Sequence, residues 1–259
     1  MMADNQMTED RGQMTEDGKQ KTEDSINILY SEVSVNVIDT AIKEGRPALT
    51  EYESKQVLAA YGLPVTREEL VNSPEDLHKA ADKIGYPVVI KGCSADIAHK
   101  TEKGLIRVDV RNDEEATKAF REISAAMNGV SNGAVLVQQF VKGQRELVIG
   151  LTRDPQFGPC VMFGLGGIFT EILKDTAFRV APLEKQDALD MMQEIKTRKI
   201  LEAIRGMAAA DQDMLAEMLM TVGQIGIENE HIKEIDINPL IISNGKPIAV
   251  DALVVLQTS

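Results

Sequence analysis

The sequence predicts an α+β protein, because segments with the period of a helix alternate with short apolar segments typical of strands. Hydrophobic residues make up 43% of the 259 residues, which is enough to bury a sizeable core in one large domain or two closely packed lobes. Near the end of the chain, two strand-like segments flank Asn244 and Gly245, a pair that favours a tight hairpin turn. A mixed architecture with a C-terminal hairpin follows.

The N-terminal segment differs in composition from the rest of the chain. It repeats the phrase QMTED twice and then adds KTED, with almost nothing apolar to bury. Such a segment cannot offset the entropy lost on ordering, so we expect residues 1–25 to be a disordered tail. A weak helical pattern follows until Gly45 and Pro47 interrupt it, which predicts a helical lead-in over residues 26–48.

The first half of the folded part contains clear start and stop signals for two helices. Thr50 and Glu53 have the spacing of a capping box, which opens a helix that ends at Gly62. Ser73, with Pro74 at the first helical position, opens a second helix that runs to about residue 85. Further along, apolar and alternating segments predict strands at 87–90, 105–110, 134–141 and 146–151, and a helical repeat predicts a helix at 114–127.

The second half predicts one more strand, a helical region and the hairpin. The apolar segment 159–162 is typical of a strand, and residues 184–229 have the pattern of two or three helices. Segments 232–242 and 247–255 predict the two strands of the hairpin.

The composition argues against several classes of function. Lys and Arg number 28 and Asp and Glu number 41, and the net charge of −13 repels nucleic acid. We predict no export signal and no membrane span, because no apolar segment is long enough for either. Cys93 and Cys160 form neither a CxxC pair nor a disulfide framework, which favours a reducing cytoplasm.

Three oxygen-bearing side chains converge in the predicted hairpin. Asp236 and Asn238 are two residues apart in a strand and therefore point to one face, and the hairpin returns Asp251 beside them. Hard oxygen ligands are what Mg²⁺ requires where it bridges nucleotide phosphates. We therefore predict a metal site at these residues; the alternative is a strand with polar residues on its solvent face.

A glycine-rich segment, FGLGGIFTE, follows the strand predicted at 159–162. Gly164, Gly166 and Gly167 would let backbone N–H groups approach phosphate oxygens. The segment is neither GxGxxG nor a P-loop, and a simple turn would have the same composition. Arg179 follows as a cation suited to stabilising charge on a transferred phosphoryl group.

Other candidates lie on strands and loops of the first half. Lys91 ends the buried strand PVVIK, where it would either meet α- and β-phosphates or extend to solvent. Gln138 and Gln139 would reach an adenine edge. His99 lies in a polar loop and is either a phosphoryl acceptor or simply exposed. The sequence contains no HExxH, Cys/His cluster or GxSxG, which argues against zinc and serine-hydrolase chemistry.

Together these segments resemble the ATP-grasp nucleotide-binding subunit, or domain, of ADP-forming acyl-CoA synthetases, with succinyl-CoA synthetase as a more distant relative. The resemblance spans about residues 49–256 and is carried by LTEYESKQVLAAYGLPV, PVVIKGCSADIAHKTEKG, ELVIGLTRDPQFGPCVMFGLGGIFTEILKDTAFRVAPL, and EIDINPL with AVDA. It implies an ATP-grasp fold in which a small lobe at 49–137 and a large lobe at 138–257 clamp the nucleotide.

The resemblance also implies a reaction, in which acyl-CoA, ADP and phosphate reversibly give the acid, CoA and ATP. His99 matches the histidine that relays phosphate from a second histidine on a separate, CoA-binding α-type subunit, so we expect a hetero-oligomer with CoA on the partner. ATP or ADP and Mg²⁺ are the ligands implied for this chain. By the same resemblance, Lys91 contacts phosphates, and the adenosine pocket is lined by Gln138, Gln139, Phe140, Val141 and Glu146. Phosphate is also approached by Gly164, Gly166 and Gly167. The resemblance further implies that Mg²⁺ is held by Asn238 and Asp251, with Asp236 nearby.

The chain departs from the family pattern at two positions near His99. Ala95 replaces a proline and Leu105 replaces a glycine, so we expect the loop to be aimed differently. Two alternative functions stay open. A free-standing ATP-grasp carboxylate–amine ligase would carry a substrate domain before the grasp, where this sequence has only about 48 mostly polar residues. A nucleotide sensor without chemistry would form no phosphohistidine.

Overall fold

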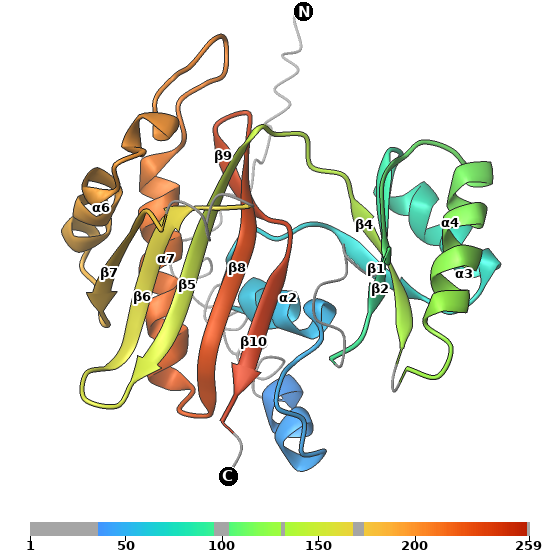
Figure 1. The fold of residues 1–259 in the computed structure, drawn as a ribbon, viewed down its shortest axis with the longest axis horizontal. Helices are drawn as coiled ribbons and strands as arrows, with labels where there is room; N and C mark the ends of the chain where they lie inside the picture. Colours follow the sequence, from blue (N-terminus) through green and yellow to red (C-terminus); the bar gives the residue numbers. More distant parts are fainter. Residues whose placement is uncertain (1–35, 96–103, 131–132, 168–173, 258–259) are drawn as a thin grey trace, which may run out of the picture.

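The computed structural model describes residues 36–95, 104–130, 133–167 and 174–257, which form two lobes, each with helices packed on a sheet (Figure 1). The named strand pairs are all antiparallel, and the predicted α+β class is confirmed. The elements are α2 Glu51–Ala60, β1 Glu68–Val71, α3 Pro74–Ile84, β2 Val88–Cys93, β3 Ile106–Val110, α4 Asp113–Ala126, β4 Ala134–Gln139, β5 Arg145–Asp154, β6 Gly158–Leu165, β7 Thr176–Val180, α6 Lys185–Glu194, η1 Arg198–Leu201, α7 Gln212–Glu228, β8 Ile232–Ser243, β9 Lys246–Ala249 and β10 Ala252–Leu256.

The small lobe contains a four-stranded sheet in the order β1-β4-β2-β3. Helices α3 and α4 pack on this sheet and on each other, and Figure 1 shows them at the far edge of the lobe. Leu77 of α3, Ile123 of α4 and Ile90 of β2 belong to one buried apolar cluster. Burial of these side chains holds the helices to the sheet.

The large lobe contains a sheet in the order β10-β8-β5-β6-β7, with β9 paired to β8. Ile149, Phe163, Ile237 and Ala252 lie directly opposite one another on neighbouring strands and share the buried face. Helices α6 and α7 pack on the sheet, and their side chains join the same cluster (Figure 1). Because side chains alternate along a strand, Asp236 points to the opposite face of the sheet.

Helix α2 packs with the large lobe, which corrects the prediction that the small lobe begins at residue 49. Leu49, Val57 and Leu58 belong to the apolar cluster of the large lobe, and α2 packs against β10. From residue 36 on, the chain therefore begins in the large lobe, crosses to the small lobe after α2 and returns after β4 (Figure 1). The predicted boundary between the small and large lobes, after residue 137, lies two residues before the end of β4 at Gln139.

Local signals predicted most elements within a few residues. The capping box of α2 is present: the Glu53 N–H donates to Thr50 Oγ1 at 3.2 Å and the Thr50 N–H donates to Glu53 Oε2 at 2.8 Å. Ser73 caps α3 as predicted, with Pro74 inside the first turn. Residues 36–43 are helical, whereas 1–35, with the predicted tail, lie outside the described residues. Strands β1 and β7, both at sheet edges, were not predicted.

The C-terminal hairpin differs from the prediction in one useful way. Asn244 and Gly245 turn the chain with φ of 50° and 84°, as their sequence favours. The predicted strand 247–255 is divided into β9 and β10 by Val250 and Asp251, and both parts pair with β8. The break gives the Val250 carbonyl partners outside the ladder.

None of the helices in the described part of the chain has both the length and the apolar character needed to cross a bilayer. This agrees with the charged composition of the chain.

Because α2 packs in the large-lobe core, replacing a leucine of α2 should cost more stability than replacing an exposed leucine of β1. Leu58→Ala, at a fully buried position, should lower the free energy of unfolding by about 2–5 kcal/mol. Leu70→Ala, on β1 and 39% exposed, should cost less than about 1 kcal/mol. Urea denaturation of the two variants measures both values, and equal losses would contradict the assignment of α2.

Candidate functional site

The predicted metal ligands meet at the break between β9 and β10. Asp251 lies directly opposite Asn238, whose N–H donates to the Asp251 carbonyl at 3.2 Å. Asp236 lies two residues before Asn238 on β8, opposite Leu253. Burial, with added repulsion from Glu234 and Asp251, raises the pKa of Asp236 to about 6. A bound cation would offset both the burial of this carboxylate and its repulsion by the two neighbours.

These side chains suit Mg²⁺ if phosphate and water complete its shell. Mg²⁺ is usually held by one or two carboxylates and by the substrate's phosphates. The Asp251 side chain is 29% exposed, and the carboxamide oxygen of Asn238 keeps one lone pair beyond the bond it accepts. Groups of three or more His, Cys, Asp or Glu side chains that could hold a metal by themselves do not occur in the described ranges. A site shared with a nucleotide fits this geometry.

The glycine-rich segment leads directly to these ligands. The Gly167 N–H donates to Asn238 Oδ1 at 3.0 Å, and the Gly166 N–H donates to the Glu146 carbonyl at 2.9 Å. The end of β6 is thereby fixed between β5 and the metal ligands. The rest of the predicted segment, residues 168–171, lies outside the described residues.

The glycines are required by close packing as well as by any ligand. A Cβ at Gly166 would lie 2.3 Å from the Leu147 carbonyl oxygen, and one at Gly164 would lie 2.6 Å from the Asp175 carbonyl oxygen. Gly167 has φ of 65°, and a Cβ there would lie 2.0 Å from Glu146 Oε2. A side chain at Gly166 or Gly167 would push the turn away from β5, and one at Gly164 would meet the backbone at the start of β7.

Lys91 projects from the small lobe towards the metal ligands of the large lobe. Its Nζ donates to Glu51 Oε1 at 2.8 Å and lies 3.6 Å from Asp251 Oδ2. The side chain is nearly buried, which contradicts the alternative of a lysine extended into solvent. Lys91 is thus a cation beside the candidate metal site.

A second lysine, Lys55 of α2, is buried behind Lys91. Its Nζ donates to Glu51 Oε1 at 2.8 Å and pairs with Glu68 Oε2. Burial opposes the positive charge, but the carboxylates of Glu51 and Glu68 outweigh it and raise the pKa of Lys55. Burial also raises the pKa of Glu68 to about 7, against the opposing effect of Lys55. We call Glu51, Lys55, Glu68 and Lys91 the buried ion cluster.

The Val250 carbonyl connects the buried ion cluster to the metal ligands. It accepts hydrogen bonds from Lys55 Nζ at 3.1 Å, from Gln138 Nε2 at 3.1 Å and from Lys91 Nζ at 3.4 Å. Val250 directly precedes Asp251 in the chain. The position of this peptide, and so of the metal ligand, depends on donors from α2, β2 and β4.

Gln138 differs from its predicted role at an adenine edge. Its side chain is fully buried, because Oε1 accepts from Lys55 Nζ at 3.2 Å and Nε2 donates to Val250. The side chain is committed to the protein and does not read a base. Gln139 is only half-buried and accepts from Arg67 Nε at 3.2 Å, while Phe140 and Val141 begin the connection to β5.

Arg179 is not brought to the site. It lies opposite the buried residue Val161 and therefore points to the face of the large sheet that carries the helices. Its guanidinium pairs with Glu194 of α6, which explains the raised pKa of Arg179. The metal ligands are on the other face, so the predicted phosphate contact by Arg179 is corrected to a structural ion pair.

The candidate acceptor His99 lies in 96–103, outside the described residues. The segment leaves β2 shortly after Lys91 and rejoins the described chain at Gly104. Leu105, where the family pattern has glycine, is buried, and its carbonyl accepts the Gly92 N–H at 2.9 Å. The change at this position is therefore accommodated in the small-lobe core.

Sequence reasoning missed Glu51, Lys55 and Glu68. A signal for the first two was present, because their spacing of four places both on the face of α2 that carries Leu58. Charged residues on the apolar face of a helix indicate a buried pair. Glu68 has no such signal in a short edge strand.

The chain matches a known family and its relatives over almost all of the described part. The model of the ATP-grasp domain family matches residues 40–256. The chain is 44% identical over 224 residues to the acetate–CoA ligase (ADP-forming) I subunit beta of Pyrococcus furiosus, covering 85% of this chain and 96% of that one. It is 30% identical over 212 residues to the succinate–CoA ligase (ADP-forming) subunit beta of Haloarcula marismortui, covering 79% and 54%.

Solved structures agree with this assignment. Acetyl-coenzyme A synthetase 1 of Ca. Korarchaeum cryptofilum, in complex with coenzyme A, Ca-AMPCP and HgCl⁺, is 43% identical with a TM-score of 0.82, covering 86% of this chain and 100% of that one. The same protein with coenzyme A and Mg-AMPPCP, described with its phosphohistidine segment pointing towards the nucleotide binding site, gives a TM-score of 0.78 at 43% identity and the same coverage. The predicted two-lobed ATP-grasp fold is confirmed.

The packing of the glycine turn predicts a large cost for one methyl group. Gly166→Ala should lower the free energy of unfolding by about 3 kcal/mol, because the new Cβ meets the rigid backbone of β5. Gly158→Ala is the control. Its φ is 76°, but a Cβ there would have no atom within 4 Å apart from its chain neighbours, so only the left-handed backbone should lower the free energy of unfolding, by about 1 kcal/mol. Denaturant titration compares them, and a smaller loss at Gly166 would disprove the close approach.

The buried carboxyl of Glu68 predicts a dependence of stability on pH. Because its pKa is raised to about 7, the folded protein retains a proton that the unfolded chain releases near 4.5. This contribution to stability is present at low pH and is lost as pH rises from about 4.5 through about 7. It amounts to at most about 3 kcal/mol.

Chemical denaturation of the parent protein and of Glu68→Gln, at several values of pH between about 5 and 8, measures the effect. The slope of unfolding free energy against pH should be shallower in the variant, whatever its absolute stability. Parallel curves would contradict the raised pKa.

Proposed function

The chain belongs to the ATP-grasp family, as a β-type subunit of ADP-forming acetate–CoA ligases, and we propose that it transfers a phosphoryl group reversibly between His99 and ADP. The proposal takes the complete reaction to be acyl-CoA, ADP and phosphate giving acid, CoA and ATP. An α-type subunit that binds CoA and carries its own active-site histidine would complete it in a hetero-oligomer. The subunit name of the Pyrococcus furiosus relative supports such a partner.

The observation that carries the proposal is the meeting of three phosphate-handling groups at one place. The glycine turn reaches Asn238 through the Gly167 N–H at 3.0 Å, Asn238 faces Asp251, and Lys91 Nζ lies 3.6 Å from Asp251. These groups come from both lobes, as clamping of a nucleotide requires.

Each side chain has a role in this proposal. Asn238 and Asp251 would hold Mg²⁺ with Asp236 nearby, and the bound ion would supply positive charge that neutralises and orients the nucleotide phosphates. Lys91 donates to phosphate oxygens as a compact point charge. The turn at Gly166 and Gly167, which follows β6, would hold the Asn238 carboxamide in place through the Gly167 N–H. The complex of the Korarchaeum relative with Mg-AMPPCP supports a nucleotide and Mg²⁺ as the ligands of this site.

Adenosine would bind where the chain returns from the small lobe to the large one. The Gln139 N–H donates to the Arg67 carbonyl at 2.8 Å, so both chain crossings lie side by side here. Phe140 and Val141 follow, and Glu146 is half-buried at the start of β5. Backbone groups of this connection, rather than the buried Gln138 side chain, would meet the base.

The proposed phosphoryl transfer is reversible, and ADP is the acceptor in the direction of ATP formation. A terminal phosphate oxygen of ADP forms a bond to the phosphorus carried by His99, the bond from the imidazole nitrogen to phosphorus breaks, and neutral imidazole leaves. Positive charge from Lys91 balances the negative charge that the phosphates bring together. A sensor would bind the nucleotide without this exchange, and a free-standing ligase would need an amine acceptor.

Labelling with ATP carrying a radioactive γ-phosphate tests the proposal. Incubated with Mg²⁺, the chain should acquire an acid-labile, base-stable label that ADP removes. His99→Asn should lose the label and retain magnesium-dependent ADP binding, because only the acceptor nitrogen is removed. His231→Asn, just before β8, is the control and should be labelled normally.

Asp251→Ala should reduce both labelling and magnesium-dependent ADP affinity at least roughly tenfold, because it removes a metal ligand. Nucleotide binding without any label in the parent protein would favour the sensor instead. Label retained in full by His99→Asn would refute the relay through this residue.

A further inference from the structure

The buried ion cluster joins the two lobes at the place where the proposed site is formed. Glu51 and Lys55 belong to α2, which packs in the large-lobe core, whereas Glu68 and Lys91 belong to the small-lobe sheet. The Lys55 side chain is only 1% exposed, so its ammonium is held wholly by protein atoms. A buried charge in such a place is restricted to the arrangement that satisfies it.

Two short connections lead from Lys55 to the residues proposed to touch ligand. Glu51 Oε1 accepts from both Lys55 and Lys91 at 2.8 Å, so the position of Lys91 Nζ depends on the atom that Lys55 holds. The Val250 carbonyl accepts from Lys55 at 3.1 Å and is one peptide away from Asp251. Lys55 therefore acts on the phosphate-binding cation and on the metal ligand at once.

We propose that Lys55 is a positioning residue for the nucleotide and metal site, holding Lys91 through Glu51 and Asp251 through the Val250 carbonyl. This inference rests on the proposed function, because it concerns the same site. Lys55 touches neither substrate nor metal. Its effect is on where the groups that do so are placed, and residues that orient metal ligands change metal affinity by about 10–100-fold when they are replaced.

The test needs a variant that removes the ammonium without leaving a buried carboxylate unpaired. Lys55→Met combined with Glu68→Gln removes one charge of each sign and leaves the Glu51–Lys91 pair intact. A single Lys55→Met change would instead leave the buried Glu68 carboxylate without its cation and destabilise the fold. The double variant is therefore the informative one.

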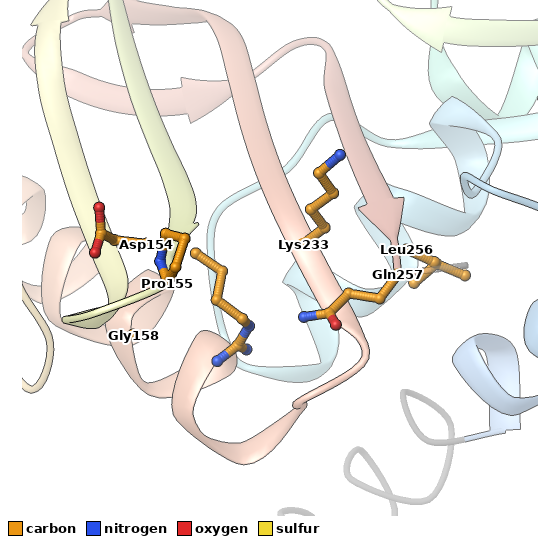
Figure 2. A pocket seen from close by; sticks show the side chains of 7 residues that line it. Asp154, Pro155, Gly158, Lys233, Leu256 and Gln257 are labelled. Carbon is orange, nitrogen blue, oxygen red and sulfur yellow. The ribbon is translucent and has the colours of Figure 1, made fainter. Parts of the chain in front are cut away.

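The control is Arg153→Met at the other end of the large sheet. Arg153 also donates to backbone carbonyls, those of Gly226, Asn229 and Ile232, but it lines a cavity of about 630 Å³ away from the site. Figure 2 shows this cavity beside Asp154, Lys233 and Gln257. Its loss should lower stability and leave nucleotide binding unchanged.

The measurement is the ADP dissociation constant of the full chain by calorimetry, with Mg²⁺ and with chelator. We expect the factor by which Mg²⁺ tightens ADP binding to fall at least roughly tenfold in the double variant and to stay unchanged in Arg153→Met. A purely structural role would lower the unfolding free energy in both and leave that factor unaltered. An unaltered factor in a folded double variant would overturn the inference.

If the double variant does not fold, the Gln138→Leu variant provides a second test of the inference. This variant keeps every charge and removes the hydrogen bond from Gln138 to the Val250 carbonyl. The factor by which Mg²⁺ tightens ADP binding should therefore also fall, but by less than in the double variant. An unchanged factor there would overturn the inferred route from the Val250 carbonyl to Asp251. Absence of magnesium-dependent ADP binding in the parent protein would instead refute the proposed function, which separates the two failures.

Discussion

The arrangement of the site depends on one buried interaction, the ammonium of Lys55 held between Glu51, Glu68 and the Val250 carbonyl. Taking these charges out of water is costly, and the cost is offset only when every donor and acceptor is matched. The matching groups come from α2, β1, β2, β4 and the break between β9 and β10. One local requirement therefore ties the small lobe to the end of the large-lobe sheet.

The hairpin at the C-terminus is what makes this requirement possible. At the break between β9 and β10 the Val250 N–H donates to the Pro239 carbonyl at 3.1 Å, but Pro239 has no N–H to donate back to the Val250 carbonyl. The break leaves it to Lys55, Lys91 and Gln138, and the same break places Asp251 opposite Asn238. A small irregularity in the sheet thus serves both the join between the lobes and the candidate metal site.

Much of the fold was readable from local patterns, and so was the convergence of Asp236, Asn238 and Asp251, because strand alternation and an Asn-Gly turn determine both. Other features depend on partners distant in sequence. Arg179 lies in a strand with no clear pattern, and only its register with Val161 shows which face it joins. Gln138 was predicted to reach an adenine edge, but its side-chain oxygen accepts a hydrogen bond from Lys55, which lies 83 residues away in sequence.

The resemblance to a family supplied what neither pattern nor register could, namely a role for His99 and a CoA-binding partner, and these stay predictions. Nucleotide and metal would share one site between the lobes. The most direct measurement is a crystal structure of the chain with ADP and Mn²⁺ in place of Mg²⁺, located by its anomalous signal. We expect the ion to be bonded to Asn238 Oδ1 and the Asp251 carboxylate, with Lys91 Nζ in contact with a phosphate oxygen. An ion bound away from both residues would contradict it.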